Sequence, residues 1–350
     1  MNIVVEDFGK VGNETVQLFT LENDNGVTIK LTNYGGIITS IITPDKNDKA
    51  KNVVLGFDKL ETYLSEQYLN SYPYFGCIIG RVGNRISNSQ FKLNEKLYKL
   101  SANHGENQLH GGLEGFDKKI WQARNFENED EIGVDLSYLS VDGEEGFPGD
   151  LSVLVRYTLN NENELGMEYF AETDKATPVN LTQHTYFNLG EETTIHNHKL
   201  QVLCEKYTEL NADSIPTGNL NSVEQSVYDL RQLKRIGNGF SELEMGYDIN
   251  YCFDNANGSL KKIAELVDEV SGRKIEVSTT QIGMQVYTGA YNPEIEIDGE
   301  KKFGKFSGVA LETQGFPDAV NQPKFPSIIL NPVKKYHQKT IYRFSTINKA

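Results

Sequence analysis

Short runs of alternating apolar and polar residues, separated by turn residues, restrict this chain to a narrow set of folds. The runs Thr15 to Leu21 and Val27 to Thr32 lie on either side of Asn25-Gly26, a pair that readily adopts the positive φ values of a hairpin turn. A longer run, Leu151 to Leu159, has an apolar side chain at every second position. We find no long amphipathic helical pattern, and glycine, tyrosine and phenylalanine are frequent. The chain is therefore expected to be an all-β protein.

Few other elements interrupt these runs. Leu60 to Leu64 is predicted to form one helical turn, Val227 to Ile236 a short surface helix, and the charged segment Asn292 to Phe306 an exposed loop. We also expect a hairpin around Ser271-Gly272. A length of 350 residues would suit two average domains, but a large β-sandwich also fills it. Because no repeat or linker is evident, residues 1–350 are expected to form a single domain.

Charge and targeting features restrict the partners of the chain. It carries 34 Lys and Arg against 49 Asp and Glu, a formal net charge of -15, which repels nucleic acid and anionic membranes. Three widely spaced cysteines indicate neither a disulfide framework nor a CxxC-type metal site. The first ten residues do not resemble a secretion signal, and no stretch reaches the roughly 18 apolar residues of a membrane span. We expect a soluble cytoplasmic protein that acts on a small neutral molecule.

One carboxylate stands out in the predicted strand Val309 to Gln314. Val309 and Leu311 fall on one face, and Glu312 shares the other face with Gln314. An ionised group out of water is costly unless it is paired or used in function. Three prolines between Phe316 and Pro326 prevent the strand from continuing. Glu312 is thus either an exposed edge carboxylate or a site residue beside a rigid loop.

A second predicted strand, Asn180 to Leu189, is polar on one face and apolar on the other. Five residues with hydrogen-bonding side chains share the polar face: Asn180, Thr182, His184, Tyr186 and Asn188. This pattern is typical of the floor of a polar cleft, although a lone histidine in a strand is often structural. His196 and His198 also alternate, but two histidines without a third ligand are poor evidence for a metal site. We expect both on the surface or in loops.

A glycine-rich block, Tyr74 to Ile86, contains Arg81 and Arg85. A guanidinium suits vicinal hydroxyls or a carboxylate, but it can also hold a loop by donating to carbonyl groups. The glycine spacing does not match a phosphate-binding loop. His110 precedes two glycines and is therefore free to face a cleft. Trp121 is expected either in the core or beside a cleft, where its ring would pack on a sugar.

Five blocks, in this order, resemble the aldose 1-epimerases, also called galactose mutarotases. They are Gly80 to Ile86, Asn107 to Gly112, Thr182 to Leu189, Gly246 to Asn250 and Leu311 to Pro326. Five ordered blocks are far more specific than any one of them. The resemblance runs from about Asn33 to Phe344. It implies a large antiparallel β-sandwich of the galactose mutarotase-like supersandwich type with few short helices, and a sugar bound in an open cleft on one sheet.

The resemblance also implies roles for individual residues. Glu312 would be the general base and His184 the general acid, and His110 would assist at the ring oxygen. Hydroxyl groups of the sugar would be bound by Asn84, Arg85 and Asp248, with secondary contacts from Gln285 and Gln314. The sequence departs mildly from the family pattern at Gln183, where many relatives carry asparagine. No metal, nucleotide or redox cofactor is expected.

This residue set suits the interconversion of the α and β anomers of a hexose. The anomeric hydroxyl must lose a proton while the ring oxygen gains one, so that the ring opens, rotates about the C1–C2 bond and closes again. One base and one acid on opposite sides of that bond would each contribute roughly a hundredfold to ten-thousandfold. At neutral pH a free glutamate is ionised and a free histidine is partly protonated. Their mutual attraction is expected to favour the charged pair.

Two alternatives stay open. A hexose-6-phosphate 1-epimerase would share the glutamate and the histidine, but it would need additional Arg or Lys at the far end of the cleft. A noncatalytic sugar-binding sandwich would tolerate the loss of either residue. The sequence leaves open which sugar is preferred, among galactose, glucose, xylose and others, and whether the protein is a monomer or a homodimer.

Overall fold

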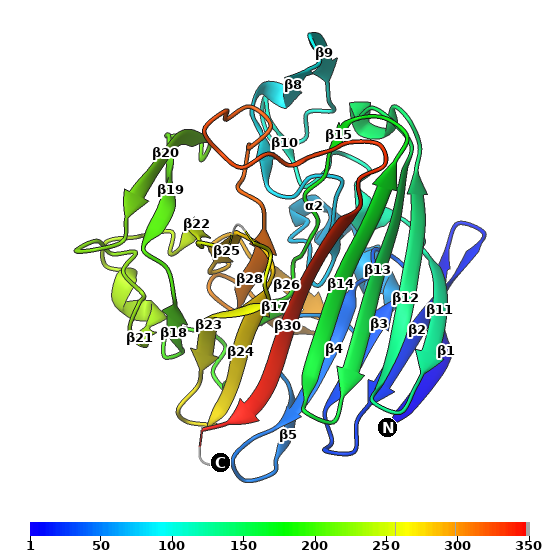
Figure 1. Ribbon diagram of the computed structural model, residues 1–350. Coiled ribbons are helices and arrows are strands. Elements are labelled where there is room, and N and C mark those ends of the chain that lie inside the picture. The colour runs from blue at the N-terminus through cyan, green and yellow to red at the C-terminus, as the bar shows by residue number, and fades with distance from the viewer. Residues whose placement is uncertain (256, 298, 348–350) are drawn as a thin grey trace.

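The computed structural model describes residues 1–255, 257–297 and 299–347 of the chain (Figure 1). The expected domain, 1–350, and the expected loop, Asn292 to Phe306, therefore include positions that lie outside the described residues. Strands dominate, as expected. The α-helices within the described ranges are α1 (Leu60–Tyr63) and α2 (Glu66–Ser71). Short 3₁₀ turns are η1 (Ser87–Ser89), η2 (Phe116–Lys118), η3 (Glu144–Gly146) and η4 (Ile236–Gly239). No helix of the described part is long and apolar enough to span a bilayer.

An antiparallel sheet of nine strands forms one layer of the molecule and crosses the front of Figure 1. From one edge to the other its strands are β11 (Gln122–Glu127), β12 (Glu131–Ser140), β13 (Leu151–Asn160), β14 (Glu164–Thr173), β30 (Tyr336–Thr346), β24 (Arg273–Thr279), β23 (Lys261–Val267), β18 (Lys199–Val202) and β21 (Lys234–Arg235). The apolar positions of the run Leu151 to Leu159 are all buried, as the alternation predicts.

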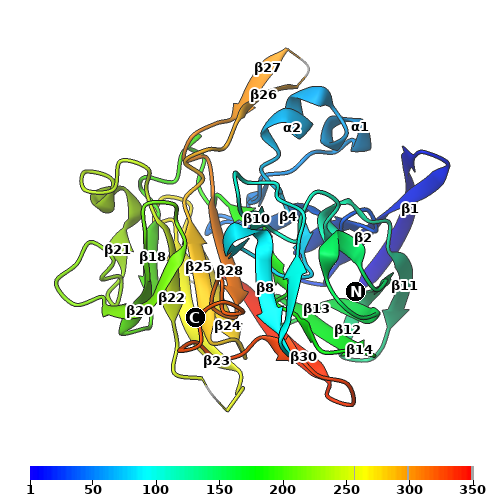
Figure 2. The ribbon, with the colours of Figure 1, turned by 90° about the horizontal axis from the view of Figure 1, so that it is seen from above.

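Two further antiparallel sheets face this layer, as the view from above shows (Figure 2). The first is β1 (Asn2–Val11), β2 (Glu14–Glu22), β3 (Thr28–Thr32), β4 (Ile38–Pro44) and β5 (Ala50–Asn52). The second is β17 (Tyr186–Phe187), β28 (Val309–Gln314), β25 (Gly283–Tyr287), β22 (Asp248–Cys252), β19 (Lys206–Leu210) and β20 (Pro216–Ser222).

Five two-stranded ladders complete the described strands. They are β6 (Ile78–Ile79) with β16 (Thr182–Gln183), β7 (Arg85–Ile86) with β10 (Gln108–Leu109), β8 (Gln90–Leu93) with β9 (Lys96–Lys99), β15 (Thr177–Pro178) with β29 (Ile329–Leu330), and β26 (Glu294–Ile297) with β27 (Glu300–Phe303). The first two of these ladders position residues of the site.

One hydrophobic cluster fills the space between the three large sheets. It contains Ile29 of β3, Val155 of β13 and Leu311 of β28, all fully buried. Burial of each such side chain stabilises the fold by roughly 1.5–3 kcal/mol. Thr313 of β28 also faces the nine-stranded sheet, where its hydroxyl contacts that of Thr340 at 2.5 Å. The alternate residues of β28 therefore point away from the core, to the opposite face of the six-stranded sheet.

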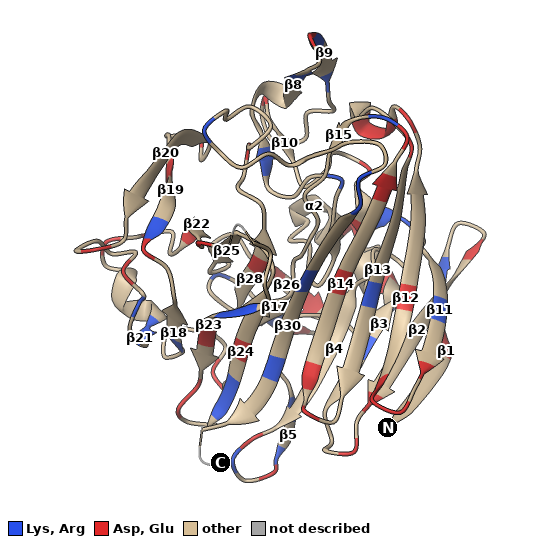
Figure 3. Cartoon of the chain, viewed as in Figure 1, with Lys and Arg blue, Asp and Glu red and all other residues tan. Residues whose placement is uncertain are grey.

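The outer face of the nine-stranded sheet is polar, with acidic and basic residues interspersed along it (Figure 3). Arg156 of β13 pairs with Asp135 of β12 at 2.7 Å, and Lys339 of β30 pairs with Glu168 of β14 at 2.6 Å. Pairs of this kind near the surface contribute about 0–1 kcal/mol each. Such pairs are typical of a solvated face. They do not indicate a binding site on this side of the nine-stranded sheet.

Both predicted hairpins and the predicted helical turn are present. Strands β2 and β3 pair on either side of Asn25-Gly26, and β23 and β24 pair on either side of Ser271-Gly272. The predicted surface helix from Val227 to Ile236 was wrong. Its main chain instead forms hydrogen bonds with the segment from His198 to Val202, which includes β18. The amide of Val202 donates to the carbonyl of Leu230, and the amide of Ile236 donates to the carbonyl of His198. Two apolar side chains of this segment, Leu230 and Ile236, are buried in the core, whereas Leu233 is 37% exposed.

The expectation of an exposed loop from Asn292 to Phe306 was also wrong for the described residues. The segment forms the hairpin β26–β27, in which Glu294 pairs with Phe303. Ile295 is fully buried in a second hydrophobic cluster, and the ring of Phe303 packs 5.3 Å from that of Phe75. These few apolar side chains suffice to dock a hairpin that is otherwise charged.

Candidate active site

A cavity of about 340 Å³ opens on the outward face of the six-stranded sheet. Seven of the eight residues assigned to the site by resemblance line it: Asn84, Arg85, His110, His184, Asp248, Gln285 and Glu312. Gln314 does not line it. Its side chain is fully buried, and its Nε2 donates to Oδ1 of Asn250 at 3.3 Å. The expected secondary contact of Gln314 with a sugar stays a prediction, and in this structure the side chain binds Asn250 instead.

Glu312 lies on β28, which is flanked by β17 and β25, and Gln285 of β25 is directly opposite. The side chain is 2% exposed, and Oε2 has no hydrogen-bond partner. Burial raises the pKa of Glu312 well above its ordinary 4.5, and the charge of Asp248 raises it further, whereas Arg85 lowers it. Glu312 is therefore a buried carboxyl group with a strong affinity for a proton, and the reading as an exposed edge carboxylate was wrong.

His184 does not lie in a continuous strand, contrary to expectation. The segment divides into β16, which pairs with β6, and β17, which pairs with β28. His184 occupies the bend between them, where its amide donates to Cys77 and its carbonyl accepts from Gly76. The chain bends here because consecutive residue pairs bind to different neighbouring strands.

The expected five-residue polar face is broken by this bend. His184 and Tyr186 line the cavity. The side chain of Asn180 instead holds Gly315, accepting from its amide at 2.7 Å and donating to its carbonyl at 3.2 Å. Asn188 donates to the carbonyl of Ser307 at 2.9 Å. These asparagines satisfy buried backbone groups, a structural role that strand alternation alone does not distinguish from binding.

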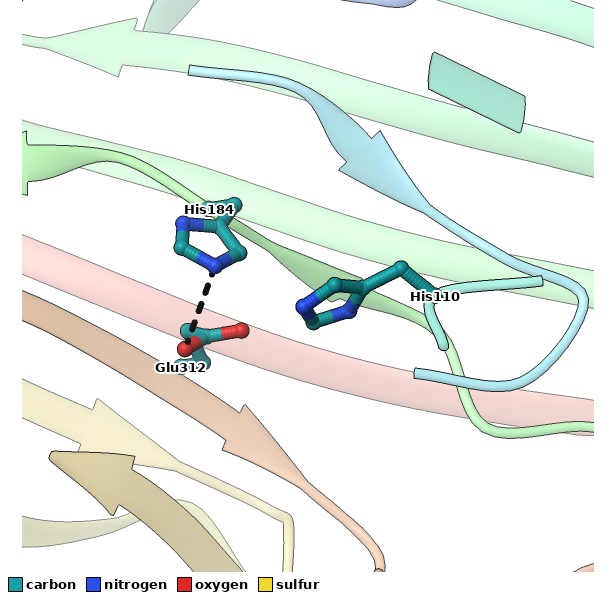
Figure 4. Close-up of side chains that lie close together, drawn as sticks. All are labelled: His110, His184 and Glu312. Carbon is teal, nitrogen blue, oxygen red and sulfur yellow. Dashed lines mark ion pairs between the residues drawn. The ribbon is translucent and has the colours of Figure 1, made fainter. Parts of the chain in front are cut away.

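His184 and Glu312 face one another across the cavity (Figure 4), with Nε2 of the imidazole 3.6 Å from Oε1 of the carboxyl group. Burial lowers the pKa of His184 from 6.5 to about 4. The expected preference for a charged pair was therefore wrong. Desolvation opposes both charges, so the neutral pair is favoured, with a proton on Glu312 and none added to His184.

His110 follows β10 with a positive φ of 51°, a conformation that allows its ring to turn into the cavity. Figure 4 shows the ring directed toward the pair formed by His184 and Glu312. Nδ1 of His110 accepts from the amide of Asn84 at 3.3 Å. Burial, together with the neighbouring His184, lowers the pKa of His110 well below 6.5. The neutral ring therefore carries its proton on Nε2 and can donate it to an oxygen in the cleft.

The same three side chains offer the donor atoms of a metal site. One atom from each of His110, His184 and Glu312 lies within 4.8 Å of the others, and imidazole and carboxylate are ordinary zinc ligands. A metal on Nε2 of His110 would move the ring proton to Nδ1, where it would meet the amide N–H of Asn84. The hydrogen bonding of His110 thus fits proton transfer better than metal binding.

The polar contacts at one side of the cavity come from three elements. Nε2 of Gln285 donates to Oδ1 of Asp248 at 2.5 Å, which orients both side chains toward the cavity. Arg85 lies at the start of β7, and its buried Nε has no partner. A guanidinium and a carboxylate with unused hydrogen-bonding capacity are suited to a ligand with several hydroxyl groups.

The two arginines of the glycine-rich block have different roles. Arg81 is 2% exposed and donates to the carbonyl groups of Ser140, Val141 and Pro148 at 2.9–3.1 Å. It holds a loop together, whereas Arg85 lines the cavity. The sequence left both possibilities open for each of them.

The remaining candidates are structural. Trp121 is buried in the main core and its indole donates to the carbonyl of Phe116 at 3.2 Å. His198 was expected at the surface or in a loop, but it is 1% exposed. Its Nε2 accepts a hydrogen bond from the buried amide of Leu189 at 2.8 Å. His196 contacts the hydroxyl of Thr194 at 2.9 Å.

Several aromatic residues of the site were missed by the sequence analysis. Tyr74 and Tyr287 line the cavity, as does the exposed His104. The ring of Tyr74 stacks on that of His184 at 5.9 Å and lies 4.7 Å from that of His110. Nothing in the local sequence marks these residues, because their role depends on neighbours that are distant along the chain.

Comparisons with known proteins agree with this geometry. Residues 17–343 match the family described as aldose 1-epimerase. The galactose mutarotase of Bos taurus is 41% identical over 346 residues, which cover 96% of both chains. The chain belongs to the aldose 1-epimerase family. The galactose mutarotase of Homo sapiens is also 41% identical, over 97% of both chains.

The fold of the aldose 1-epimerases extends over the whole chain. The solved galactose 1-epimerase of Lactobacillus acidophilus superposes with a TM-score of 0.86 at 26% identity and covers 99% of both chains. The expected all-β sandwich is thereby confirmed. The family match extends from β2 to β30 and so includes every residue that lines the cavity.

Proposed function

We propose that this protein is an aldose 1-epimerase that interconverts the α and β anomers of galactose- or glucose-type hexoses. The observation that carries the proposal is the pairing of one acid and one base at 3.6 Å, His184 and Glu312, inside a cleft of about 340 Å³. A second imidazole, that of His110, is directed at the same point (Figure 4). Ring opening of a hexose needs these groups and no others, since it consists of two proton transfers and the cleavage of one C–O bond.

The reacting form of the site carries one proton on the pair, on His184, with Glu312 as the carboxylate. Glu312 accepts the proton of the anomeric hydroxyl while His184 donates its proton to the ring oxygen, and the bond between C1 and that oxygen breaks. His110 assists this step by donating a hydrogen bond from Nε2 to the ring oxygen. After rotation about the C1–C2 bond, Glu312 returns its proton to the carbonyl oxygen and His184 recovers its own from the C5 hydroxyl.

The electrostatics of the cleft favour the open-chain intermediate. Burial raises the pKa of Glu312 and lowers that of His184, so the pair favours a protonated carboxyl and a neutral imidazole. This is the proton distribution that ring opening produces. Interactions that stabilise the product of a proton transfer also stabilise the transition state that leads to it.

The charges around the cleft favour a neutral sugar over a sugar phosphate. The cavity continues into a wider groove of about 1030 Å³, with which it shares Arg85 and Asp248. Among the described residues, Arg85 is the one Lys or Arg that lines either space, against three carboxylates besides the buried Glu312: Glu106, Asp213 and Asp248. A phosphate at the far end would meet net negative charge, which argues against the hexose-6-phosphate alternative.

We also propose that the chain acts as a single domain. The main hydrophobic cluster contains residues of all three large sheets, so no sheet has a separate core. The site is built on this shared framework: Glu312 comes from the six-stranded sheet, and His184 and His110 come from segments that pack beside it.

The test follows the optical rotation of freshly dissolved α-D-galactose in dilute buffer, where uncatalysed mutarotation is slow. Wild type is expected to accelerate the approach to equilibrium, and Glu312→Gln to lose roughly a hundredfold to ten-thousandfold of the rate while still binding sugar by calorimetry. Glu265→Gln, on the outer face of β23, is the matched control and should retain full activity.

Two outcomes would contradict the proposal. No acceleration by wild type of the mutarotation of galactose or glucose, or of their 6-phosphates, would favour a noncatalytic sugar-binding sandwich. Acceleration restricted to the 6-phosphates would favour the hexose-6-phosphate 1-epimerase.

A further inference from the structure

Asp117 is a buried carboxylate outside the cleft that the proposed chemistry does not use. It lies in η2 and is 1% exposed. Oδ2 accepts a hydrogen bond from the hydroxyl of Tyr72 at 2.7 Å, and Oδ1 has no hydrogen-bond partner. Burial raises the pKa of Asp117 to about 6, against the opposing effect of the bond from Tyr72. Burying a carboxyl group away from water costs free energy. The hydrogen bond from Tyr72 therefore indicates that this buried carboxyl group has a role.

The partner of Asp117 belongs to a segment with an unusual backbone. Tyr72 has a φ of 22° and Tyr74 a φ of 58°, on either side of Pro73. Residues with a bulky side chain rarely adopt positive φ, and they keep it where the surrounding structure holds them there. Two contacts hold Tyr72. Nζ of Lys118 lies 4.8 Å from the centroid of its ring, and Asp117 accepts a hydrogen bond from its hydroxyl.

Tyr72 and Tyr74 both line the cavity, and Tyr74 connects this segment to the two imidazoles. Its ring lies 4.7 Å from that of Tyr72, edge to face. On its other side it lies 4.7 Å from the ring of His110 and stacks on that of His184 at 5.9 Å, with an interplanar angle of 25°. The segment also touches the main chain of His184, because the carbonyl of Cys77 accepts from its amide at 2.9 Å. Residues 72–77 thus form the wall against which both imidazoles rest.

We propose that Asp117 is a positioning residue that acts through the hydroxyl of Tyr72 to hold Tyr74 against the two imidazoles of the cleft. The three side chains form one continuous series of contacts, from a buried carboxylate to the acid of the reaction. The effect on the reaction rate rests on the proposed function, whereas the effect on the imidazoles does not.

The physical reason is the sensitivity of proton transfer to geometry. Nε2 of His184 must face both the ring oxygen of a sugar and Glu312, and a misplacement of about 1 Å can cost a hundredfold in rate. The ring of His184 has no hydrogen bond at Nδ1 from another residue to fix its orientation. The orientation of that ring therefore depends on its neighbours, namely Tyr186 at 4.9 Å, His110 at 5.1 Å and the stacked Tyr74 at 5.9 Å. Tyr74 also contacts His110, and Asp117 restrains Tyr74 through Tyr72.

The test compares Tyr72→Phe, which removes the hydroxyl, with Tyr63→Phe as a matched control. Tyr63 belongs to the same aromatic cluster and its hydroxyl accepts from the amide of Phe57 at 2.9 Å, but its ring does not contact Tyr74. Tyr72→Phe is expected to lower kcat for galactose mutarotation about tenfold or more, with KM changed less than about twofold. Tyr63→Phe should leave kcat unchanged even where it lowers thermal stability.

A second pair of variants tests Asp117 itself. Asparagine keeps an oxygen that can accept from Tyr72, whereas leucine does not, so Asp117→Asn should retain most of the kcat that Asp117→Leu loses. The imidazole nitrogen signals of His184 and His110, observed by long-range proton–nitrogen NMR without sugar, should shift in Tyr72→Phe and Asp117→Leu and stay in place in Tyr63→Phe.

The proposal is overturned if the imidazole signals of Tyr72→Phe and Asp117→Leu match those of Tyr63→Phe, or if their kcat falls no further than that of the control. Because the NMR measurement needs no turnover, it also separates the two proposals. Shifted signals in a protein that does not accelerate mutarotation would support the positioning role and overturn only the proposed function. If Asp117→Leu does not fold, the comparison of Tyr72→Phe with Tyr63→Phe decides.

Discussion

Nε2 of His184 lies 3.6 Å from Oε1 of Glu312, and both side chains are at most 4% exposed. At this distance the two groups share one environment, and burial acts on them in opposite directions, raising the pKa of the carboxyl group and lowering that of the imidazole. The pair therefore holds one proton over a wide range of pH. In the proposed reaction this proton passes from His184 to the ring oxygen, while Glu312 takes up another from the anomeric hydroxyl.

The first prediction concerns the pH dependence of kcat/KM, which should be bell-shaped. Below the pKa of His184, about 4, both groups are protonated and no base remains. Above the raised pKa of Glu312 both have lost their protons and no acid remains. Polarimetry across this range checks the prediction. An acid limb near 6.5, the ordinary value for histidine, would show that burial does not govern this pair.

The second prediction concerns the basic limb of that profile. The charge of Asp248 raises the pKa of Glu312, and that of Arg85 lowers it. Asp248→Asn should therefore move the basic limb to lower pH, and Arg85→Gln should move it to higher pH. Both variants also weaken sugar binding, so the measurement compares the shapes of the profiles and not their heights. Shifts in the same direction for both variants would refute the electrostatic assignment.

The third prediction separates the two neighbouring arginines. Arg81→Gln should lower the free energy of unfolding by about 3 kcal/mol or more, because each buried carbonyl left unpaired costs roughly 1–3 kcal/mol. Arg85→Gln should leave stability nearly unchanged and raise KM about tenfold to a hundredfold, from the loss of a charged hydrogen-bond donor to the sugar. Urea unfolding and steady-state kinetics of both variants provide the check. Equal effects of the two variants on KM would contradict the structural role of Arg81.

The fourth prediction concerns acid stability. The folded-state pKa of His198 is lowered by burial from 6.5 to about 4, an effect that the charge of Asp268 partly offsets. A lowered pKa of this kind contributes stability that is fully present above pH 6.5 and is lost as the pH falls toward about 4. In His198→Gln the free energy of unfolding should fall less over this interval, by about 3 kcal/mol at most. Denaturant unfolding at several pH values tests it, and parallel curves for both proteins would contradict it.

The local patterns of the sequence are sufficient for several features of the molecule. Strict alternation correctly predicts the strand that carries Glu312 and the outward direction of its side chain, because each strand residue faces opposite to the next. The same rule fails at His184, where the chain changes partner strands within four residues. It also cannot distinguish Glu312 from Gln314, which share a face although only Glu312 lines the cavity.

The sequence by itself determined the all-β class, the family resemblance and the residue types available for acid–base chemistry, since these follow from local periodicity and ordered motifs. Only the tertiary structure decided which arginine faces the cleft, that Tyr74 packs against both histidines, and that burial opposes a charge on both members of the central pair. The reason is that burial and the contacts between distant segments set these properties. Desolvation depends on what surrounds a group in space, and spacing along the chain does not record it.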